Sequence, residues 1–262
     1  MYSEENDFIE KSAACKSLLT SISPYFENKD ISLALELGGE GGVLSGLLTQ
    51  TFNRGICTDI VNVNSHYGGE FAKLLREKFK RNGFDLDLGK IEFHTADAQN
   101  LIYGNEKFDL VFSLNAFEHI PDPLKAIDEA HRVLRPKGVF YASFDPVWSA
   151  DSGNHFMNYV NEPWLHLLVS DKEFRKKMAS AGAAEWEVRQ YPQQMNRLPA
   201  RFYKTQFKQR LTSLFSIVEM EEWSGCVSEE YVEHINRRKA AEKNGWNPSE
   251  LLIRGFKFVA VK

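Results

Sequence analysis

The sequence lacks the features that mark secreted and membrane proteins. It has three cysteines, Cys15, Cys57 and Cys226, whose spacing fits neither a disulfide framework nor a metal site. No stretch approaches the run of about 18 apolar residues that a membrane span needs. The acidic opening, MYSEENDFIEK, contains no apolar core like that of a signal peptide. We therefore expect a cytoplasmic protein without membrane insertion.

Positive charge is also scarce, since 32 lysines and arginines face 36 aspartates and glutamates, for a net charge of −4. Proteins that bind nucleic acid are more often basic, so we expect no nucleic-acid partner. The chain has no Gly-x-Ser-x-Gly elbow of the kind found in serine hydrolases. It also shows no group of Asp, Glu or His at metal-site spacing, so no metal is expected.

Apolar runs and amphipathic segments alternate along the first half of the chain. The runs predict strands at 31–37, 54–61, 90–97, 107–115 and 138–144. Helical spacing predicts helices at 5–25, 42–50, 68–82 and 122–136. This alternation indicates a doubly wound, mostly parallel sheet, which binds ligands at the carboxyl ends of its strands.

The pattern changes after residue 146. Residues 147–210 are rich in aromatic side chains, histidine and arginine and lack clear strands, whereas 212–223 and 251–262 again resemble strands. The charged segment 224–250 between them is predicted to be helical. We therefore expect a seven-stranded, Rossmann-like α/β sheet with a helical cap inserted after the fifth strand. The expected parts are an N-terminal helical segment (1–30), the core (31–146), a substrate-binding cap (147–210) and the final strands with a helical insertion (211–262).

Four stretches occur in an order typical of one enzyme family. They are LELGGEGG from residue 35, CTDI from 57, TADAQNL from 95, and FDLVFSLNAFEHIPDPLKAIDEAHRVLRPKGVFYASF from 108. With these motifs the sequence resembles the class I S-adenosylmethionine-dependent methyltransferases, in particular the small-molecule type related to the ubiquinone and menaquinone enzymes. The resemblance covers residues 30–146 well and the last strand loosely. It implies a Rossmann-like enzyme with S-adenosyl-L-methionine as its cofactor.

The glycine-rich turn departs from the family pattern of an acid followed by Gly-x-Gly-x-Gly. Glu36, Gly38 and Gly42 match it, but Glu40 replaces the middle glycine, and Gly39 precedes it. A left-handed Glu40 would cost about 1–2 kcal/mol. A carboxylate here would attract the ammonium and sulfonium of S-adenosylmethionine and repel a pyrophosphate. The alternative is that Glu40 points to solvent.

Other predicted cofactor contacts follow the second, third and fourth strands. Asp59 is placed to accept hydrogen bonds from ribose hydroxyls, and Ile60 to pack on the adenine. The resemblance implies that Asp97 accepts from the adenine amino group and that the Ala98 amide meets a ring nitrogen. It also places Asn115 beside the methionine moiety. The alternative for both aspartates is a turn or helix cap.

Candidate catalytic groups lie after the fourth and fifth strands. His119, His155 and Asp145 could each take a proton from a hydroxyl acceptor, because an imidazole titrates near neutrality and a carboxylate accepts protons. A structural role is the alternative for the histidines. Trp164 could recognise a sugar or an aromatic alcohol, or it could belong to the core of the cap.

A basic segment near the end of the expected cap admits two interpretations. Arg197, Arg201 and Lys204 could face a phosphate or carboxylate of the acceptor, or they could lie on a solvated helix. The aromatic residues between them do not distinguish these two interpretations.

The sequence thus predicts an S-adenosylmethionine-dependent methyltransferase that acts on a small molecule or glycan, most simply by O-methylation. One alternative is a non-catalytic, methyltransferase-like binding or scaffold protein, which the Glu40 substitution favours. A nicotinamide-dependent oxidoreductase is a weaker alternative, because the chain lacks a proper dinucleotide turn. The sequence indicates neither the acceptor nor the oligomeric state.

Overall fold

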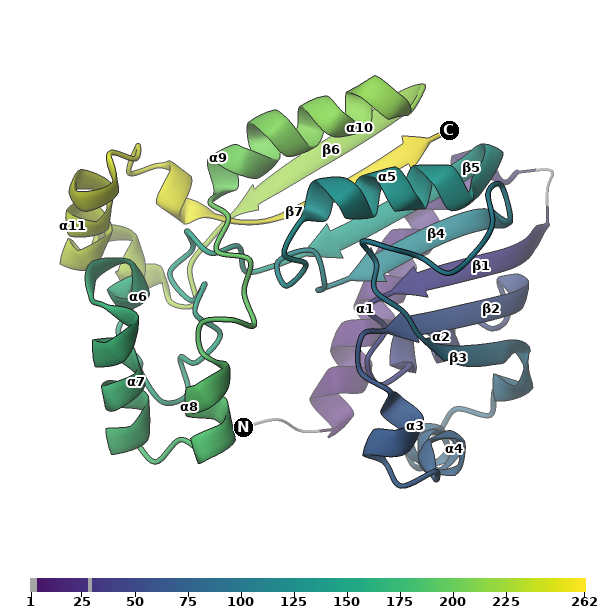
Figure 1. The fold of residues 1–262 in the computed structure, drawn as a ribbon, viewed down its shortest axis with the longest axis horizontal. Helices are drawn as coiled ribbons and strands as arrows, with labels where there is room; N and C mark the ends of the chain where they lie inside the picture. The colour runs from purple at the N-terminus through teal and green to yellow at the C-terminus, as the bar shows by residue number, and fades with distance from the viewer. Residues whose placement is uncertain (1–3, 28–29) are drawn as a thin grey trace.

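The computed structural model describes residues 4–27 and 30–262. Its seven strands form one sheet in the order β3-β2-β1-β4-β5-β7-β6 (Figure 1). The strands are β1 (Ile31–Leu37), β2 (Phe52–Asp59), β3 (Ile91–Thr95), β4 (Phe108–Leu114), β5 (Leu134–Phe144), β6 (Ile217–Ser224) and β7 (Ile253–Val261). Strands β1 to β5 pair in parallel, whereas β7 runs antiparallel to both β5 and β6. The predicted seven-stranded, mostly parallel sheet is confirmed.

Helices connect and flank these strands. They are α1 (Glu4–Ile22), α2 (Val43–Leu47), α3 (Val63–His66), α4 (Phe71–Arg81), α5 (Pro123–Val133), α6 (Leu165–Leu168), α7 (Asp171–Ser180), α8 (Glu185–Gln190), α9 (Ala200–Phe202), α10 (Lys208–Leu214) and α11 (Ile235–Asn244). A π turn, Tyr203–Phe207, joins α9 to α10, and short 3-10 turns cover Ser23–Tyr25, Leu88–Lys90, Glu229–Glu233 and Glu250–Leu252. Across the described ranges, no helix combines the length and the apolarity that crossing a membrane requires.

Two expected elements differ from the observed ones. The helix predicted at 68–82 begins only at Phe71, as α4, because Gly68 and Gly69 before it adopt positive φ angles of 61° and 85°; the short helix α3 precedes these glycines. Positive φ lies outside the helical region, so the chain cannot continue one helix through this pair. The segment predicted as a strand at 212–223 begins as the end of α10, and β6 starts only at Ile217.

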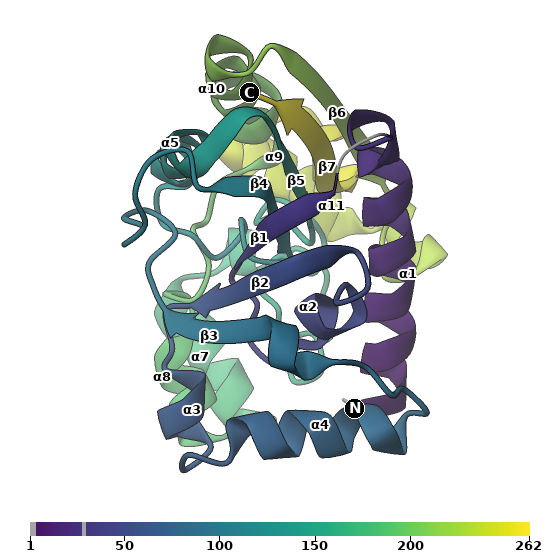
Figure 2. The same cartoon turned by 90° about the vertical axis from the view of Figure 1, so that its right-hand side faces the viewer.

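The sheet is buried on both faces, which explains its nearly continuous apolar strands. Along β5, Val139 and Tyr141 face a cluster formed with α1, α2 and α4, while Phe140 and Ala142 face a cluster formed with α5, α9 and α10. Figure 2 shows α1 and α2 on one side of the sheet and α5 on the other. The alternation of side chains along the strand therefore builds a three-layer core.

A third apolar cluster lies outside the sheet. It joins α6, α7 and the end of α8 to α11 through Trp164, Phe174, Tyr191 and Ala240. We call α6, α7, α8 and α11 the accessory helices. Figure 1 shows them beyond the carboxyl ends of β4 and β5. Trp164 is fully buried in this cluster, and its indole Nε1 donates to the Ser149 carbonyl at 3.2 Å, so the core interpretation of this tryptophan holds.

The packing groups two segments differently from the expected boundaries. Tyr203, Phe207 and Leu211 pack in the cluster with α5 and β5, although the expected cap (147–210) includes Tyr203 and Phe207. Conversely, α11 joins the accessory helices, although it follows β6. Apolar and aromatic spacing shows that a segment is buried, but it carries no information on which of two apolar surfaces the segment meets.

Candidate functional site

The glycine turn after β1 is tightly packed. Gly38 and Gly42 adopt φ angles of 70° and 66°, which favour glycine. A Cβ atom on Gly38 would lie 2.4 Å from the Cβ of Ala116, and one on Gly39 would lie 2.2 Å from the Cys57 sulfur. The turn therefore lies directly against β2 and the segment after β4, with its backbone exposed toward the carboxyl edge of the sheet.

Glu40 adopts the left-handed conformation considered in the sequence analysis, with a φ of 36°. Its backbone N–H donates to Oδ2 of Asp59 at 3.1 Å, and the other Asp59 oxygen accepts from the Val61 N–H at 2.8 Å. The side chain of Glu40 is exposed at the rim of the cavity described below. Asp59 thus holds the turn to the end of β2, and this hydrogen bond helps to offset the strain at Glu40.

Glu36 lies beneath the turn and is buried. The Ser45 hydroxyl donates to its Oε2, and burial raises the pKa of the Glu36 carboxyl, while that hydrogen bond acts in the opposite direction. The side chain also borders the cavity. A carboxyl group in this position can accept a hydrogen bond from a cationic ligand group above it.

A cavity of about 810 Å³ lies at the carboxyl ends of β1, β2, β4 and β5. Its size falls in the range of ligand sites. Nine of the predicted site residues line it: Glu36, Gly38, Gly39, Glu40, Asp59, Asn115, His119, Asp145 and His155. The structure therefore brings the predicted catalytic residues and most of the predicted cofactor contacts to one place.

Four predicted contacts lie outside the lining of this cavity. Gly42 packs beneath the turn, where an added Cβ would lie 2.6 Å from the ring of Phe93. Ile60 is 70% exposed, and its neighbour Val61 borders the cavity instead.

Asp97 and Ala98 are the other two predicted contacts that do not line the cavity. Asp97 is held in the turn that follows β3. The Asp97 carboxylate accepts from the backbone N–H of Gln99 at 2.9 Å, as expected for a turn cap. The assignment of Asp97 and Ala98 to adenine stays a prediction.

Sequence reasoning missed the outer wall of the cavity. It is formed by residues outside the motifs, on or directly after α1, α3, α4 and α8: Asp7, Lys11, His66, Tyr67, Lys78, Trp186 and Gln190. The only sequence signal was Trp186, an aromatic residue in the polar segment EWEVRQ of α8, and it is 62% exposed. Helical spacing alone cannot reveal which exposed faces border a shared cavity.

His119 and His155 meet at the inner wall. Their ring centroids lie 5.0 Å apart with planes at 81°. The Nδ1 of His119 lies 2.6 Å from the Gln194 carbonyl oxygen, and the Nε2 of His155 lies 3.3 Å from that of Pro146. A carbonyl can only accept, so these two nitrogens carry the hydrogens. Burial lowers the pKa of His119 and lowers that of His155 to about 4, so both rings are neutral at pH 7.

Asp145 is engaged by a cation. Arg254 donates through Nε to its Oδ2 at 2.8 Å, and the same guanidinium reaches Asp151 at 3.4 Å and the Ser152 hydroxyl at 3.1 Å. Arg254 thus occupies one oxygen of Asp145, whereas each histidine keeps one ring nitrogen with a free lone pair. Of the three predicted catalytic residues, the histidines are therefore better placed for proton transfer.

The basic segment has partners of its own outside the cavity. Arg197 pairs with Asp171 at 3.1 Å and lies over the Trp148 ring at 4.9 Å. Arg201 lies over the ring of Trp246 at 5.3 Å.

The third cation of this segment, Lys204, pairs with Glu222 at 3.0 Å. These contacts favour the solvated-surface interpretation over an anion site.

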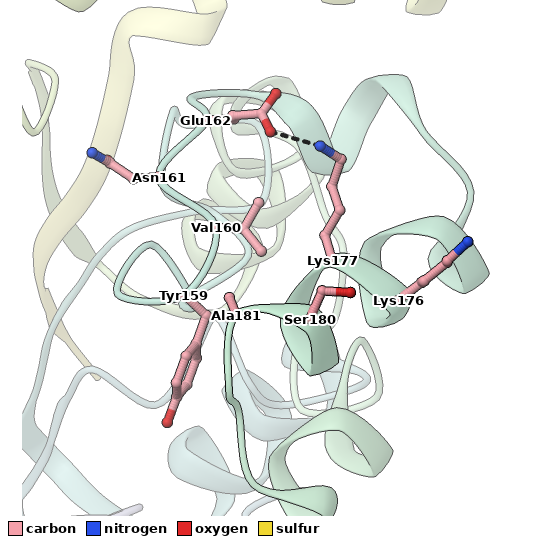
Figure 3. Close-up of a pocket in the computed structure, with 8 residues that line it drawn as sticks. All are labelled: Tyr159, Val160, Asn161, Glu162, Lys176, Lys177, Ser180 and Ala181. Atoms are coloured by element: carbon pink, nitrogen blue, oxygen red, sulfur yellow. Dashed lines mark hydrogen bonds and ion pairs between the residues drawn. The ribbon is translucent and has the colours of Figure 1, made fainter.

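A second hollow, of about 380 Å³, lies on the accessory helices (Figure 3). It is bordered by Tyr159–Glu162 and by Lys176, Lys177, Ser180 and Ala181. Figure 3 shows Lys177 reaching toward Glu162, with which it forms an ion pair of 2.7 Å, while Lys176 points outward. In this hollow the charged side chains Lys177 and Glu162 already pair with each other, and no histidine borders it. We therefore take the larger cavity as the candidate site.

Comparison with known proteins agrees with this geometry. Residues 35–142 match a family model described as a methyltransferase domain. The ubiquinone biosynthesis O-methyltransferase of Actinobacillus pleuropneumoniae serotype 5b is 26% identical over 153 residues, which cover 58% of this chain and 57% of that protein. The chain thus spans little more than half the length of this relative.

Solved structures share the fold at low identity. The [4+2]-cyclase SpnF gives a TM-score of 0.53 at 16% identity, covering 96% of this chain and 81% of that one. A geranyl diphosphate methyltransferase in complex with GPP and sinefungin gives 0.51 at 9% identity, covering 95% of this chain and 77% of that one. These likenesses show the fold alone. Residues 35–142 thus form a methyltransferase domain, and this domain, with the motifs at the carboxyl edge of the sheet, supports a class I S-adenosylmethionine-dependent methyltransferase.

Proposed function

We propose that the protein transfers a methyl group from S-adenosyl-L-methionine to a hydroxyl oxygen of a small molecule or glycan. The observation that carries this proposal is the continuity of one cavity from the glycine turn to the His119–His155 pair. A cofactor held at the turn and an acceptor held at the histidines would share that cavity. Such alignment of two reactants can supply much of the rate of a transfer reaction.

The residues at the glycine turn fit this cofactor. Three carboxyl groups, Glu36, Glu40 and Asp59, border the same end of the cavity and favour a ligand with cationic groups over a pyrophosphate. Each oxygen of Asp59 accepts one backbone amide and retains a lone pair for a ribose hydroxyl. When bound, the cofactor supplies a methyl group that its sulfonium has already activated. This charge distribution also argues against the nicotinamide alternative.

The histidine side of the cavity fits a hydroxyl acceptor. Because Nδ1 of His119 faces the Gln194 carbonyl, its Nε2 keeps a lone pair. As a free base, this nitrogen would take the hydroxyl proton while the oxygen bonds to the methyl carbon and the carbon–sulfur bond breaks. Asn115 borders the same region, with a φ of 50° that turns the chain after β4. Trp186 and Gln190 of α8 would face the acceptor from the opposite wall.

Calorimetric titration of the purified chain with S-adenosylmethionine and S-adenosylhomocysteine tests the cofactor half of the proposal. We expect dissociation constants in the micromolar range for both compounds and no heat with NAD. A panel of hydroxylated sugars and aromatic alcohols, assayed for S-adenosylhomocysteine release, then tests the acceptor class. Absence of binding to both methionine compounds would refute the proposal and favour a scaffold protein with a closed cofactor site.

A further inference from the structure

Glu118 is the most unusual charged residue of the cavity. It is 1% exposed, and neither carboxyl oxygen has a hydrogen-bond partner among the described residues. Burial raises the pKa of Glu118 well above its usual range, and the nearby charge of Asp145 acts in the same direction. A buried polar group without a hydrogen-bond partner destabilises the fold. The reaction proposed above gives this side chain no role.

The two histidines complete a set of three potential ligands. One ligand atom from each of Glu118, His119 and His155 lies within 4.8 Å of the other two. The Nε2 of His119 faces Oε1 of Glu118 at 3.9 Å, too far for a hydrogen bond. Spacing in the sequence did not predict this cluster, because His155 comes from the loop after β5 and the other two residues follow β4.

The outer contacts of the histidines are those of metal ligands. Histidines that bind a metal usually donate their second ring N–H to a carbonyl or carboxylate, which fixes the tautomer. The carbonyls of Gln194 and Pro146 accept from His119 and His155 in this way. The remaining nitrogens, Nε2 of His119 and Nδ1 of His155, therefore carry free lone pairs.

We propose that Glu118, His119 and His155 bind one divalent transition-metal ion of the zinc type. Two imidazoles and one carboxylate are a donor set that suits zinc or iron(II) and leaves open positions, whereas magnesium and calcium prefer oxygen ligands. Ligand atoms around tetrahedral zinc lie about 3.4 Å apart. The cluster would thus contract by about 1 Å on binding. The ion would give both oxygens of Glu118 a partner.

The position of the cluster gives the ion a role in methyl transfer. This part of the inference rests on the proposed function. All three residues border the cavity, so an open coordination position would be accessible to the acceptor oxygen. Coordination lowers the pKa of a bound hydroxyl by several units. The acceptor hydroxyl would then release its proton to water on binding the ion. In the metal-bound protein His119 would be a ligand, and this release would replace the free-base step given for His119 above.

Metal titration of the full chain, stripped with a chelator, tests the site without any need for an acceptor. Co²⁺ is added and followed by its visible absorption, and Zn²⁺ is titrated by calorimetry. We expect one equivalent to bind with a dissociation constant in the micromolar range or below. Glu118→Gln and His155→Gln should each weaken binding by at least about 10-fold. Mg²⁺ should not compete.

His94→Gln is the matched control. His94 also lies beside a carboxylate, with its Nε2 at 3.3 Å from Glu92, but this pair belongs to no group of three ligands among the described residues. The side chains of His94 and His119 are similarly exposed, at 32% and 38%. The control variant should bind Co²⁺ as the wild type does.

Two results would overturn the proposal: no stoichiometric Co²⁺ or Zn²⁺ binding by the wild type, or wild-type affinity in a folded Glu118→Gln variant. Thermal unfolding checks the fold of each variant, and His155→Gln is an independent test if Glu118→Gln does not fold. Titration of the same metal-free samples with S-adenosylhomocysteine separates the two proposals. Cofactor binding without metal binding would refute the metal site alone, and the reverse result would refute the proposed function alone.

Discussion

The replacement Asp59→Asn tests the link between β2, the glycine turn and the cofactor. The two Asp59 oxygens accept from the backbone N–H groups of Glu40 and Val61 at 3.1 and 2.8 Å. An asparagine keeps the shape but offers one oxygen, so its amide nitrogen would face one of these two donors. A hydrogen bond to a charged group contributes about 1.5–3 kcal/mol, so we expect the free energy of unfolding to fall by about that amount.

The same replacement should weaken cofactor binding. If the Asp59 carboxylate also accepts from the ribose, the loss of one charged acceptor costs a further 1.5–3 kcal/mol, or about 10- to 100-fold in affinity. Urea denaturation measures the first effect, and calorimetric titration with S-adenosylhomocysteine measures the second. Unchanged affinity in a folded Asp59→Asn protein would refute the assignment of this residue to the ribose.

Asp97→Asn is the matched comparison. Asp97 also follows a strand and accepts from a backbone amide, that of Gln99 at 2.9 Å, but it does not border the cavity. A turn cap predicts a loss of stability with unchanged affinity for S-adenosylhomocysteine. An adenine contact predicts a loss of affinity as well, so this variant decides between the two interpretations of Asp97.

Three further predictions concern stability and are measured by urea denaturation. Gly39→Ala places a Cβ 2.2 Å from the Cys57 sulfur and should lower the free energy of unfolding by about 1–3 kcal/mol. Gly41→Ala, whose Cβ would have no atom within 4 Å, should lower it little. Equal effects of the two replacements would contradict the packing argument. Glu40→Gly relieves the φ of 36° and should stabilise the fold by up to about 1–2 kcal/mol; a destabilised variant would show that the turn is not strained there. Arg132 lowers the pKa of Glu129, so Glu129 stabilises the fold above its unfolded pKa of about 4.3, and this contribution is lost as the pH falls through the lower folded pKa. Glu129→Gln should therefore lose about 1–3 kcal/mol at pH 7 and progressively less below pH 4; a pH-independent difference would contradict this assignment.

Much of the fold was predictable because it depends on local patterns. Residues 31–37 form a strand with the expected ends, since a parallel strand buried on both faces is a continuous apolar run. Asp59 and Asn115 lie near the cavity because each follows a strand whose carboxyl end lies at the binding edge. The start of α4 was predicted three residues too early and the short helix α3 was missed, although the pair Gly68–Gly69 that separates them stands in the sequence.

The sequence by itself determined the order of strands and helices, the glycine turn and the acids at the strand ends, because these follow from residue chemistry and short-range spacing. Tertiary structure alone decided that α10 packs on the sheet while α11 joins the accessory helices. It also decided that His155 meets Glu118 and His119, and that Trp186 borders the cavity. The physical reason is the same in each case: burial constrains which residues are apolar, but the choice of partner depends on how separate loops and helices close around the sheet.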